Sequence, residues 1–268
     1  MINAKESTLR PTMCKVNLAA LGRNYESLSR HVEGSVVMPV IKANAYGHGI
    51  REVGMYFQRI GAKRLAVAYV EEGIMLREAG VTIPIHVMGG AMVRQIPLFL
   101  EHDLILTAPS LEKLLQINET ARDMNKKAVV HLKIDTGMGR IGVHHDDTEE
   151  FLEESLRCES IIIEGIFSHF ARADEEDLAP ALLQLERFLK VLEFYPRKGL
   201  PYPLRHIANS AAIAQMPQAR FDIVRPGIIM YGVYPSPETK KTVVVEPALQ
   251  WCSEVGFVKQ IEAGTPVS

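Results

Sequence analysis

A lysine stands directly after the first strongly apolar run of the sequence. Residues 40–49 read Val-Ile-Lys-Ala-Asn-Ala-Tyr-Gly-His-Gly, with the lysine at position 42. A lysine that closes a buried strand loses hydration, and this desolvation should lower its pKa from about 10.4. A partly neutral lysine attacks carbonyl groups, so Lys42 is a candidate Schiff-base residue. A lysine that extends to the rim for solvation would explain the same position.

Two more cations follow a later apolar run. Lys133 and Arg140 bracket the segment Ile-Asp-Thr-Gly-Met-Gly. An arginine can hold a carboxylate through two parallel hydrogen bonds, so Arg140 is a candidate substrate ligand, although a solvated loop arginine is an equal alternative. Residues 137–142 also match the glycine pattern of dinucleotide-binding turns. We reject that function because residues 143–147 are typical of a loop rather than a helix, and because Glu164 lies inside an apolar run.

Polar residues end three further apolar runs. A serine hydroxyl beside free backbone N–H groups can bind phosphate, but an N-cap serine would look the same. An arginine at a strand end can pair with an acceptor in a cavity or with a neighbouring strand, and a single histidine is more often structural. The residues concerned are His169, the pair Asn209 and Ser210, and the segment Arg225, Pro226, Gly227 and Ile228.

The sequence predicts no metal site. His144, His145, Asp146 and Asp147 are suitable ligand types, but consecutive residues seldom point to one place, so a solvated loop is the better interpretation. Paired C-x-x-C, H-E-x-x-H and G-x-S-x-G motifs do not occur.

Eight apolar runs rich in Val and Ile are typical of strands buried on both faces. Helical patterns separate them, as a parallel sheet with crossover connections requires. We expect a (β/α)8 TIM barrel, whose reactive groups lie where strands end, although a doubly wound sheet has the same pattern. The runs are Val36–Ile41, Leu65–Val70, Pro84–Met88, Leu104–Thr107, Val129–Ile134, Ile161–Phe167, Leu204–Ile207 and Phe221–Val224. The helical patterns include Ala20–His31, Glu71–Ala79, Ser110–Met124, Asp147–Leu156 and Leu178–Phe194.

The pattern changes near residue 240. Thr242–Val245 and Cys252–Ile261 alternate like antiparallel strands, and no helical pattern follows. We therefore expect the barrel, with an N-terminal extension that includes Lys15–Leu18, to occupy residues 1–240. Residues 241–268 would begin an all-β domain.

Composition narrows the class of protein. The chain has 268 residues, 47% of them hydrophobic, with 30 basic against 32 acidic side chains and a net charge of -2. These values exclude a disordered chain and give no charge signature for nucleic acid or an anionic membrane. No secretory signal and no apolar run of the roughly 20 residues that span a bilayer is present. The three cysteines fit reduced thiols, and the prediction is a cytoplasmic protein.

The order of these motifs resembles the alanine racemases, which are fold-type III pyridoxal-phosphate enzymes. The resemblance implies a homodimeric racemase that interconverts L- and D-alanine with pyridoxal 5'-phosphate and supplies D-alanine for peptidoglycan. It rests on Val40–Gly49, Lys133–Arg140, Ser168–Ala171, Ala208–Ala212 and Val224–Gly232, and on the opening Arg10-Pro11-Thr12.

The resemblance also implies residue roles. Lys42 would hold the cofactor as an aldimine and act as one of two catalytic bases. Arg225 would face the pyridine nitrogen, where a fixed cation favours reprotonation at Cα over decarboxylation or transamination. Arg140 would lie near the substrate carboxylate and the phenolic oxygen, oriented by Lys133, which is often carbamylated in this family. The other cofactor-binding residues would be Asn209, His169 supporting the ring, and Tyr46, Ser210, Gly227 and Ile228 around the phosphate.

The C-terminal segment departs from the resemblance. Family members continue through a β-domain and use a tyrosine, supplied across the dimer, as the second base. Residues 264–268 are similar to the segment just before that tyrosine. The sequence does not include that tyrosine, so the second base would be missing, and we expect weak racemisation or none from this chain. The alternatives are a non-catalytic pyridoxal-phosphate carrier and a racemase of serine or another amino acid.

Overall fold

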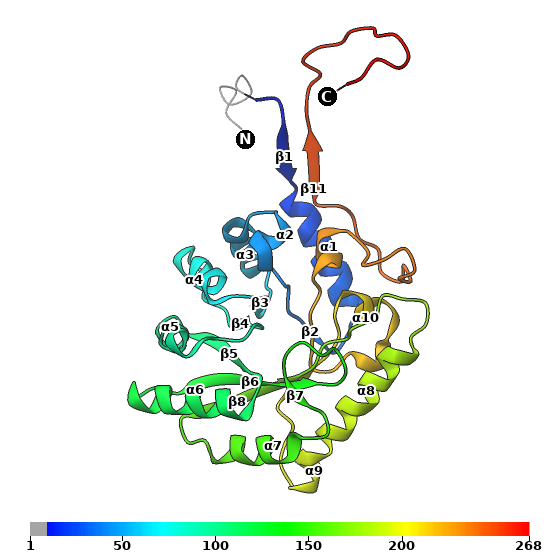
Figure 1. The fold of residues 1–268 in the computed structure, drawn as a ribbon. Coiled ribbons are helices and arrows are strands. Elements are labelled where there is room, and N and C mark those ends of the chain that lie inside the picture. The colour runs from blue at the N-terminus through cyan, green and yellow to red at the C-terminus, as the bar shows by residue number, and fades with distance from the viewer. Residues whose placement is uncertain (1–9, 268) are drawn as a thin grey trace.

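Eight parallel strands close into a barrel in the computed structural model, which describes residues 10–267 (Figure 1). Six of them follow one another in a sheet of order β3-β4-β5-β6-β8-β9, and β10 pairs with β2 in a separate parallel pair. A bridge from Val40 to Ala66 joins the β2 side to β3, and the Arg225 N–H donates to the Ala208 carbonyl over 3.0 Å between β10 and β9. The predicted TIM barrel is confirmed.

The barrel strands are short and mostly buried. β3 and β4 are buried at every residue, and so is β5, because one face of each strand packs in the barrel interior and the other against the surrounding helices. The bounds are β2 Val36–Val37, β3 Leu65–Val67, β4 Ile85–Val87, β5 Leu104–Ala108, β6 Ala128–Asp135, β8 Ile161–Phe167, β9 Leu204–His206 and β10 Ile223–Val224. A two-residue strand, β7 Val143–His144, pairs with the end of β6.

Helices surround the barrel in the expected alternation. No helical pattern was predicted for α2, α3, α5 or α9, although Val53 and Phe57 in α3 have the i, i+4 spacing of a buried face. The bounds are α1 Leu18–His31, α2 Lys42–Tyr46, α3 Ile50–Arg59, α4 Val70–Glu78, α5 Ile96–Glu101, α6 Leu111–Asp123, α7 Thr148–Arg157, α8 Ala179–Leu192, α9 Phe194–Arg197 and α10 Ser210–Gln215. None of the helices in residues 10–267 has both the length and the apolar character of a membrane span.

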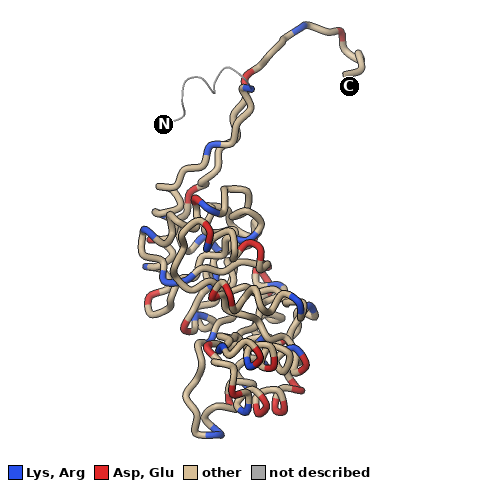
Figure 2. The backbone as a smooth tube through the Cα atoms, turned by 90° about the vertical axis from the view of Figure 1, so that its left-hand side faces the viewer, with Lys and Arg blue, Asp and Glu red and all other residues tan. Residues whose placement is uncertain are grey.

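The two ends of the described chain form a ribbon that projects from the barrel. β1 (Met13–Val16) pairs antiparallel with β11 (Leu249–Cys252). Figure 2 shows this ribbon and the residues after it extending away from the barrel, and basic and acidic residues are interspersed along the chain of the barrel. The mixed charges agree with the near-zero net charge.

The prediction of two strands in the C-terminal segment is wrong. Residues 242–245 and residues 253–267 are not assigned to strands. No described strand pairs with either segment. Val244 is 82% exposed and Phe257 is 79% exposed, whereas Val243 is buried in the core. The strand that does form, β11, pairs with the N-terminal segment instead, and nothing in the sequence pattern of either segment indicates the other as its partner. The division at residue 240 stays a prediction.

Asn24 ties α1 to the segment that leads out of the barrel. Its side chain is buried; Nδ2 donates to the carbonyls of Met230 (3.0 Å) and Glu246 (2.9 Å), and Oδ1 accepts from the Glu246 N–H over 2.9 Å. One amide thus satisfies three backbone groups that are far from it in sequence.

Replacing Asn24 with Ala should lower the free energy of unfolding by about 2–4 kcal/mol, because it leaves buried backbone groups without partners. Chemical denaturation with far-UV circular dichroism measures this loss. Arg23→Ala is the matched control, since it removes only an exposed ion pair with Glu246 and should cost much less. Equal losses for the two variants would show that the buried amide has no special role.

Candidate active site

The carboxyl ends of the barrel strands surround a cavity of about 660 Å³. Every site residue predicted from the sequence lines it, although these residues are spread over most of the chain. They are Lys42, Tyr46, Lys133, Arg140, His169, Asn209, Ser210, Arg225, Gly227 and Ile228. The barrel rule that reactive groups gather where strands end therefore brings the set together.

Lys42 is the first residue of α2 rather than the last of a strand, and it is half-buried. The backbone from Ala43 to Tyr46 has φ between 51° and 54°, which is the left-handed region. Such a conformation costs roughly 1–2 kcal/mol for each non-glycine residue. Strain of this kind persists where the surroundings fix it, often at functional sites.

The carboxylate of Glu72 holds the strained turn in place. Oε1 accepts from the Ala43 N–H over 2.5 Å, and Oε2 accepts from the N–H groups of Ala68 (2.8 Å) and Tyr69 (3.1 Å). Glu72 therefore fastens the turn that carries Lys42 to the loop after β3. The sequence analysis missed this residue, since it looked like an ordinary first-turn acid of a helix.

Ser210, Gly227 and Tyr46 form a small polar cradle beside Lys42. The Gly227 N–H donates to the Ser210 Oγ over 2.9 Å, and the Ile229 N–H lies 3.4 Å from the same oxygen. A Cβ on residue 227 would lie 2.5 Å from the Tyr46 hydroxyl, so only glycine fits there. Asn209 caps α10 by accepting from the Ala212 N–H over 3.0 Å, so the cap interpretation holds for Asn209 rather than for Ser210.

Arg225 is completely buried in the cavity wall. Its Nη1 donates to His206 Nδ1 over 2.8 Å, and its Nη2 donates to the Ser168 carbonyl over 2.8 Å and lies 3.1 Å from His169 Nδ1. Its Nε has no hydrogen-bond partner among the described residues. Burial lowers the pKa of Arg225 to about 9. The guanidinium is thus fixed through its two terminal nitrogens, and its Nε–H has no acceptor among the described residues.

His169 lines the cavity next to Arg225. Burial and the Arg225 charge hold its pKa well below the usual 6.5, so the imidazole is neutral. Gln184, a buried residue of α8, positions this loop: Nε2 donates to the His169 carbonyl over 3.1 Å and Oε1 accepts from the Ala171 N–H over 2.9 Å. A glutamine on an otherwise apolar helix face was the sequence signal for it, and it was overlooked.

Lys133 is the most perturbed lysine of the cavity. It is only 3% exposed, its Nζ donates to the Ile134 carbonyl over 2.9 Å, and Nζ lies 5.1 Å from the centre of the Phe167 ring. Burial, helped by the charge of Arg225, lowers the pKa of Lys133 from 10.5 to about 7. The sequence analysis assigned the lowered pKa to Lys42, but in the structure the deeply buried lysine of the cavity is Lys133.

Arg140 is exposed and lines the cavity from the loop after β6. The Asp135 carboxylate shapes that loop by accepting from the N–H groups of Gly137, Met138 and Gly139 at 2.9–3.1 Å. Residues 137–142 open no helix, which agrees with the rejection of a dinucleotide site. The N–H groups of the two glycines donate to Asp135, whereas in a dinucleotide site they would face a phosphate.

The loop histidines depart from expectation in one respect. The ligand atoms of His144, His145 and Asp146 lie within 4.8 Å of one another, although consecutive residues were expected to point apart. β7 ends at His144, and the turn after it brings Asp146 back beside both rings. The absence of a metal site stays a prediction.

Comparison with known proteins identifies the family. The sequence profile described as "Alanine racemase, N-terminal domain" matches residues 16–235. The chain belongs to the alanine racemase family. Among curated relatives, it is 43% identical to the alanine racemase of Carboxydothermus hydrogenoformans, over 97% of this chain and 71% of the relative. It is 41% identical to alanine racemase 2 of Caldanaerobacter subterraneus, over 97% of this chain and 68% of the relative.

Solved alanine racemases share the fold. The Clostridium difficile 630 enzyme in complex with cycloserine has a TM-score of 0.90 and 36% identity, with 94% of this chain and 70% of that chain covered. The Bartonella henselae enzyme with covalently bound pyridoxal phosphate has a TM-score of 0.81 and 25% identity, with 90% and 69% covered. The relatives and solved structures named here are alanine racemases. The roles of the individual site residues, and the expectation of weak activity, stay predictions.

The lowered pKa of Lys133 makes stability depend on pH in a defined direction. Below about pH 7 the lysine is charged in both states, and its burial costs stability. Between about 7 and 10.5 the folded state has lost the proton while the unfolded state keeps it, so stability rises with pH by up to about 1.4 kcal/mol per unit. Lys133→Met, which keeps the packing without the charge, should lack this rise. Urea unfolding of both proteins in carbon-dioxide-free buffer from about pH 6 to about pH 9 measures this rise. A difference in the free energy of unfolding between the two proteins that stays constant with pH would contradict the lowered pKa of Lys133.

Proposed function

We propose that this chain binds pyridoxal 5'-phosphate in the cavity and acts on alanine as an amino-acid racemase. The observation that carries the proposal is the convergence on one cavity of Lys42, the Ser210–Gly227 cradle and the unpaired Nε of Arg225. Membership of the alanine racemase family supports the reaction. A relative described with covalently bound pyridoxal phosphate supports the cofactor.

The residues present suit this cofactor. The cradle has a hydroxyl from Ser210, a hydroxyl from Tyr46 and backbone N–H groups at Gly227 and Ile228, all of which are donors suited to a phosphate. Residue 227 has no side chain, and its N–H donates to the Ser210 Oγ, so a phosphate would take the place of that oxygen as its acceptor. Arg225 offers one unused donor, and the pyridine nitrogen is an acceptor of the matching kind. His169 and Asn209 complete the wall.

Lys42 is the residue we assign to covalent attachment and to proton transfer at the substrate Cα. The cofactor, when bound, supplies an electron sink for the pair left by that proton. The strained turn and the Glu72 carboxylate restrict where the Lys42 side chain can go, so its amine works from one direction. Arg225 presents a fixed cation in place of a carboxylate, which limits electron withdrawal and favours return of the proton to Cα over transamination.

Arg140 and Lys133 are assigned to the substrate carboxylate. Arg140 is a bidentate donor at the cavity wall. The near-neutral amine of Lys133 can add to carbon dioxide, forming an N–C bond and releasing a proton. The resulting carbamate would replace a cation by an anion beside Arg140 and orient its guanidinium.

We further propose that the chain works in the cytoplasm as part of a homodimer and supplies D-alanine for peptidoglycan. The exposed apolar side chains of the projecting segment are consistent with a protein partner there. They include Trp251, Val255, Phe257 and Val258, each at least 75% exposed.

Adding pyridoxal phosphate to the purified chain should produce the visible absorbance band of a lysine Schiff base, because Lys42 lies beside the cradle. Lys42→Ala should abolish the band. Lys63→Ala, at an exposed lysine on the loop before β3, is the control and should keep it. A band that persists without Lys42, or a wild-type protein that never forms one, would refute the assignment.

A further inference from the structure

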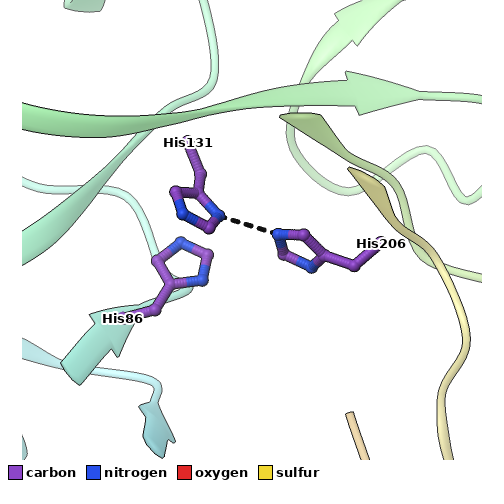
Figure 3. Close-up of side chains that lie close together, drawn as sticks. All are labelled: His86, His131 and His206. Atoms are coloured by element: carbon purple, nitrogen blue, oxygen red, sulfur yellow. Dashed lines mark hydrogen bonds between the residues drawn. The ribbon is translucent and has the colours of Figure 1, made fainter. Parts of the chain in front are cut away.

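A chain of hydrogen bonds crosses the barrel interior beneath the cavity. Figure 3 shows three histidines from β4, β6 and β9 gathered there: His86, His131 and His206. His206 Nδ1 lies 2.8 Å from Arg225 Nη1, and His206 Nε2 lies 2.7 Å from His131 Nδ1. His131 Nε2 lies 2.8 Å from an oxygen of Glu164, which also accepts two hydrogen bonds from Arg64, each 2.8 Å.

The chemistry of the two ends fixes the direction of this chain. A guanidinium can only donate, so His206 Nδ1 must accept from Arg225 and the ring proton must sit on Nε2. That proton points at His131 Nδ1, which must then accept, so the His131 proton also sits on Nε2. It ends on Glu164, which accepts when ionised. Every link therefore donates away from Arg225 and toward Glu164.

The charges around the chain agree with neutral histidines and an ionised acid. Burial and neighbouring cations lower the pKa values of His131 and His206, in the case of His206 well below 6.5. Burial alone would raise the pKa of Glu164, but hydrogen bonds from His131 and Arg64 lower it to about 2. The other charged groups beside these rings are the cations Arg64 and Arg225. Neutral imidazoles are thus the stable form there.

His86 supports the same arrangement without joining the chain. The Thr107 hydroxyl donates to the Val87 carbonyl over 2.8 Å, so it must accept from His86 Nε2, 3.0 Å away. The His86 Nδ1, which has no hydrogen-bond partner, then carries a lone pair and lies near the other two rings. A cation held by the three rings would break the His131–His206 bond and face the positive charges of Arg225 and Arg64, which disfavours a metal site.

We propose that Glu164, at the far end of this chain from the cavity, is a positioning residue for Arg225. By fixing the proton of His131, it makes His206 an obligate acceptor, and this holds the guanidinium with its Nε free. The inference rests on the proposed function in one respect only, the use of that Nε by the cofactor. The chain itself is a property of the protein without cofactor.

Glu164→Gln should abolish the uniform donor-to-acceptor direction of the hydrogen-bond chain. The carboxylate oxygen that His131 meets also accepts from Arg64 Nη1, and the other oxygen accepts from Arg64 Nη2. An amide has one acceptor oxygen and one N–H₂ donor group, so in either orientation its N–H₂ meets a donor of Arg64. If the amide N–H₂ faces His131, the chain reverses and His206 Nδ1–H meets an Arg225 N–H, leaving two donors opposed. Mixed histidine tautomers, and a less fixed Arg225, are the result.

The experiment is nitrogen-15 NMR of the ring nitrogens in cofactor-free protein labelled at histidine. In the wild type at about pH 8, the resonances of His131 and His206 should show only the neutral Nε2–H tautomer. Glu164→Gln should lose this uniform pattern, and Glu164→Asp, which keeps the charge, should restore it in part. Asp222→Asn is the control: it removes a carboxylate of similar exposure, paired with Arg205, that makes no hydrogen bond to the three rings.

The second readout is the dissociation constant of pyridoxal phosphate. We expect binding about tenfold weaker in Glu164→Gln and near wild type in Asp222→Asn. Charged, Nδ1–H or mixed tautomers at His131 or His206 in the wild type would overturn the chain, and so would a wild-type pattern retained in Glu164→Gln. If the wild type shows the expected tautomers but binds no cofactor, the proposed function fails while the chain stands. If Glu164→Gln does not fold, the wild-type and Glu164→Asp spectra still decide between these outcomes.

Discussion

The buried guanidinium of Arg225 is the constraint on which the rest of the interior depends. A fully buried cation is stable only when its N–H groups find acceptors, and the barrel provides them from the ends of two neighbouring strands, β8 and β9. This requirement explains why polar rings occupy the barrel interior where most barrels place Val, Leu and Ile. It also explains why two arginines, at opposite ends of the same hydrogen-bond chain, flank neutral histidines and a single carboxylate.

The cavity is built on a second constraint, the left-handed turn after Lys42. Four consecutive non-glycine residues adopt a conformation that the chain would avoid on its own, so packing and hydrogen bonds elsewhere must stabilise it. Two side chains provide such hydrogen bonds. The Glu72 carboxylate accepts from the Ala43 N–H, and the Asn44 Oδ1 accepts from the Ile50 N–H over 2.9 Å. A lysine fixed in this way needs little reorganisation to meet a carbonyl carbon in the cavity.

The sequence predicted the location of the site better than its internal construction. Strand-end residues such as Lys42, His169 and Arg225 follow from buried apolar runs, because parallel strands in a barrel end at one face. The strain at Ala43 was not predictable, since no local residue type signals a left-handed turn there. Glu164 was noticed only as a false dinucleotide match: its partner His131 is remote in sequence, so its contact is set by the pairing of β6 with β8. The projecting strands were misplaced for a related reason, since the partner of β11 lies at the opposite end of the chain.

We propose that Lys42 exchanges the Cα proton of alanine, and that the fixed cation of Arg225 favours the return of that proton to Cα. The most direct measurement is the exchange of that proton with solvent deuterium, followed by NMR, in the presence of the chain and pyridoxal phosphate. We predict exchange that depends on the cofactor and disappears in Lys42→Ala. Formation of the lysine Schiff base without any exchange at Cα would contradict the account.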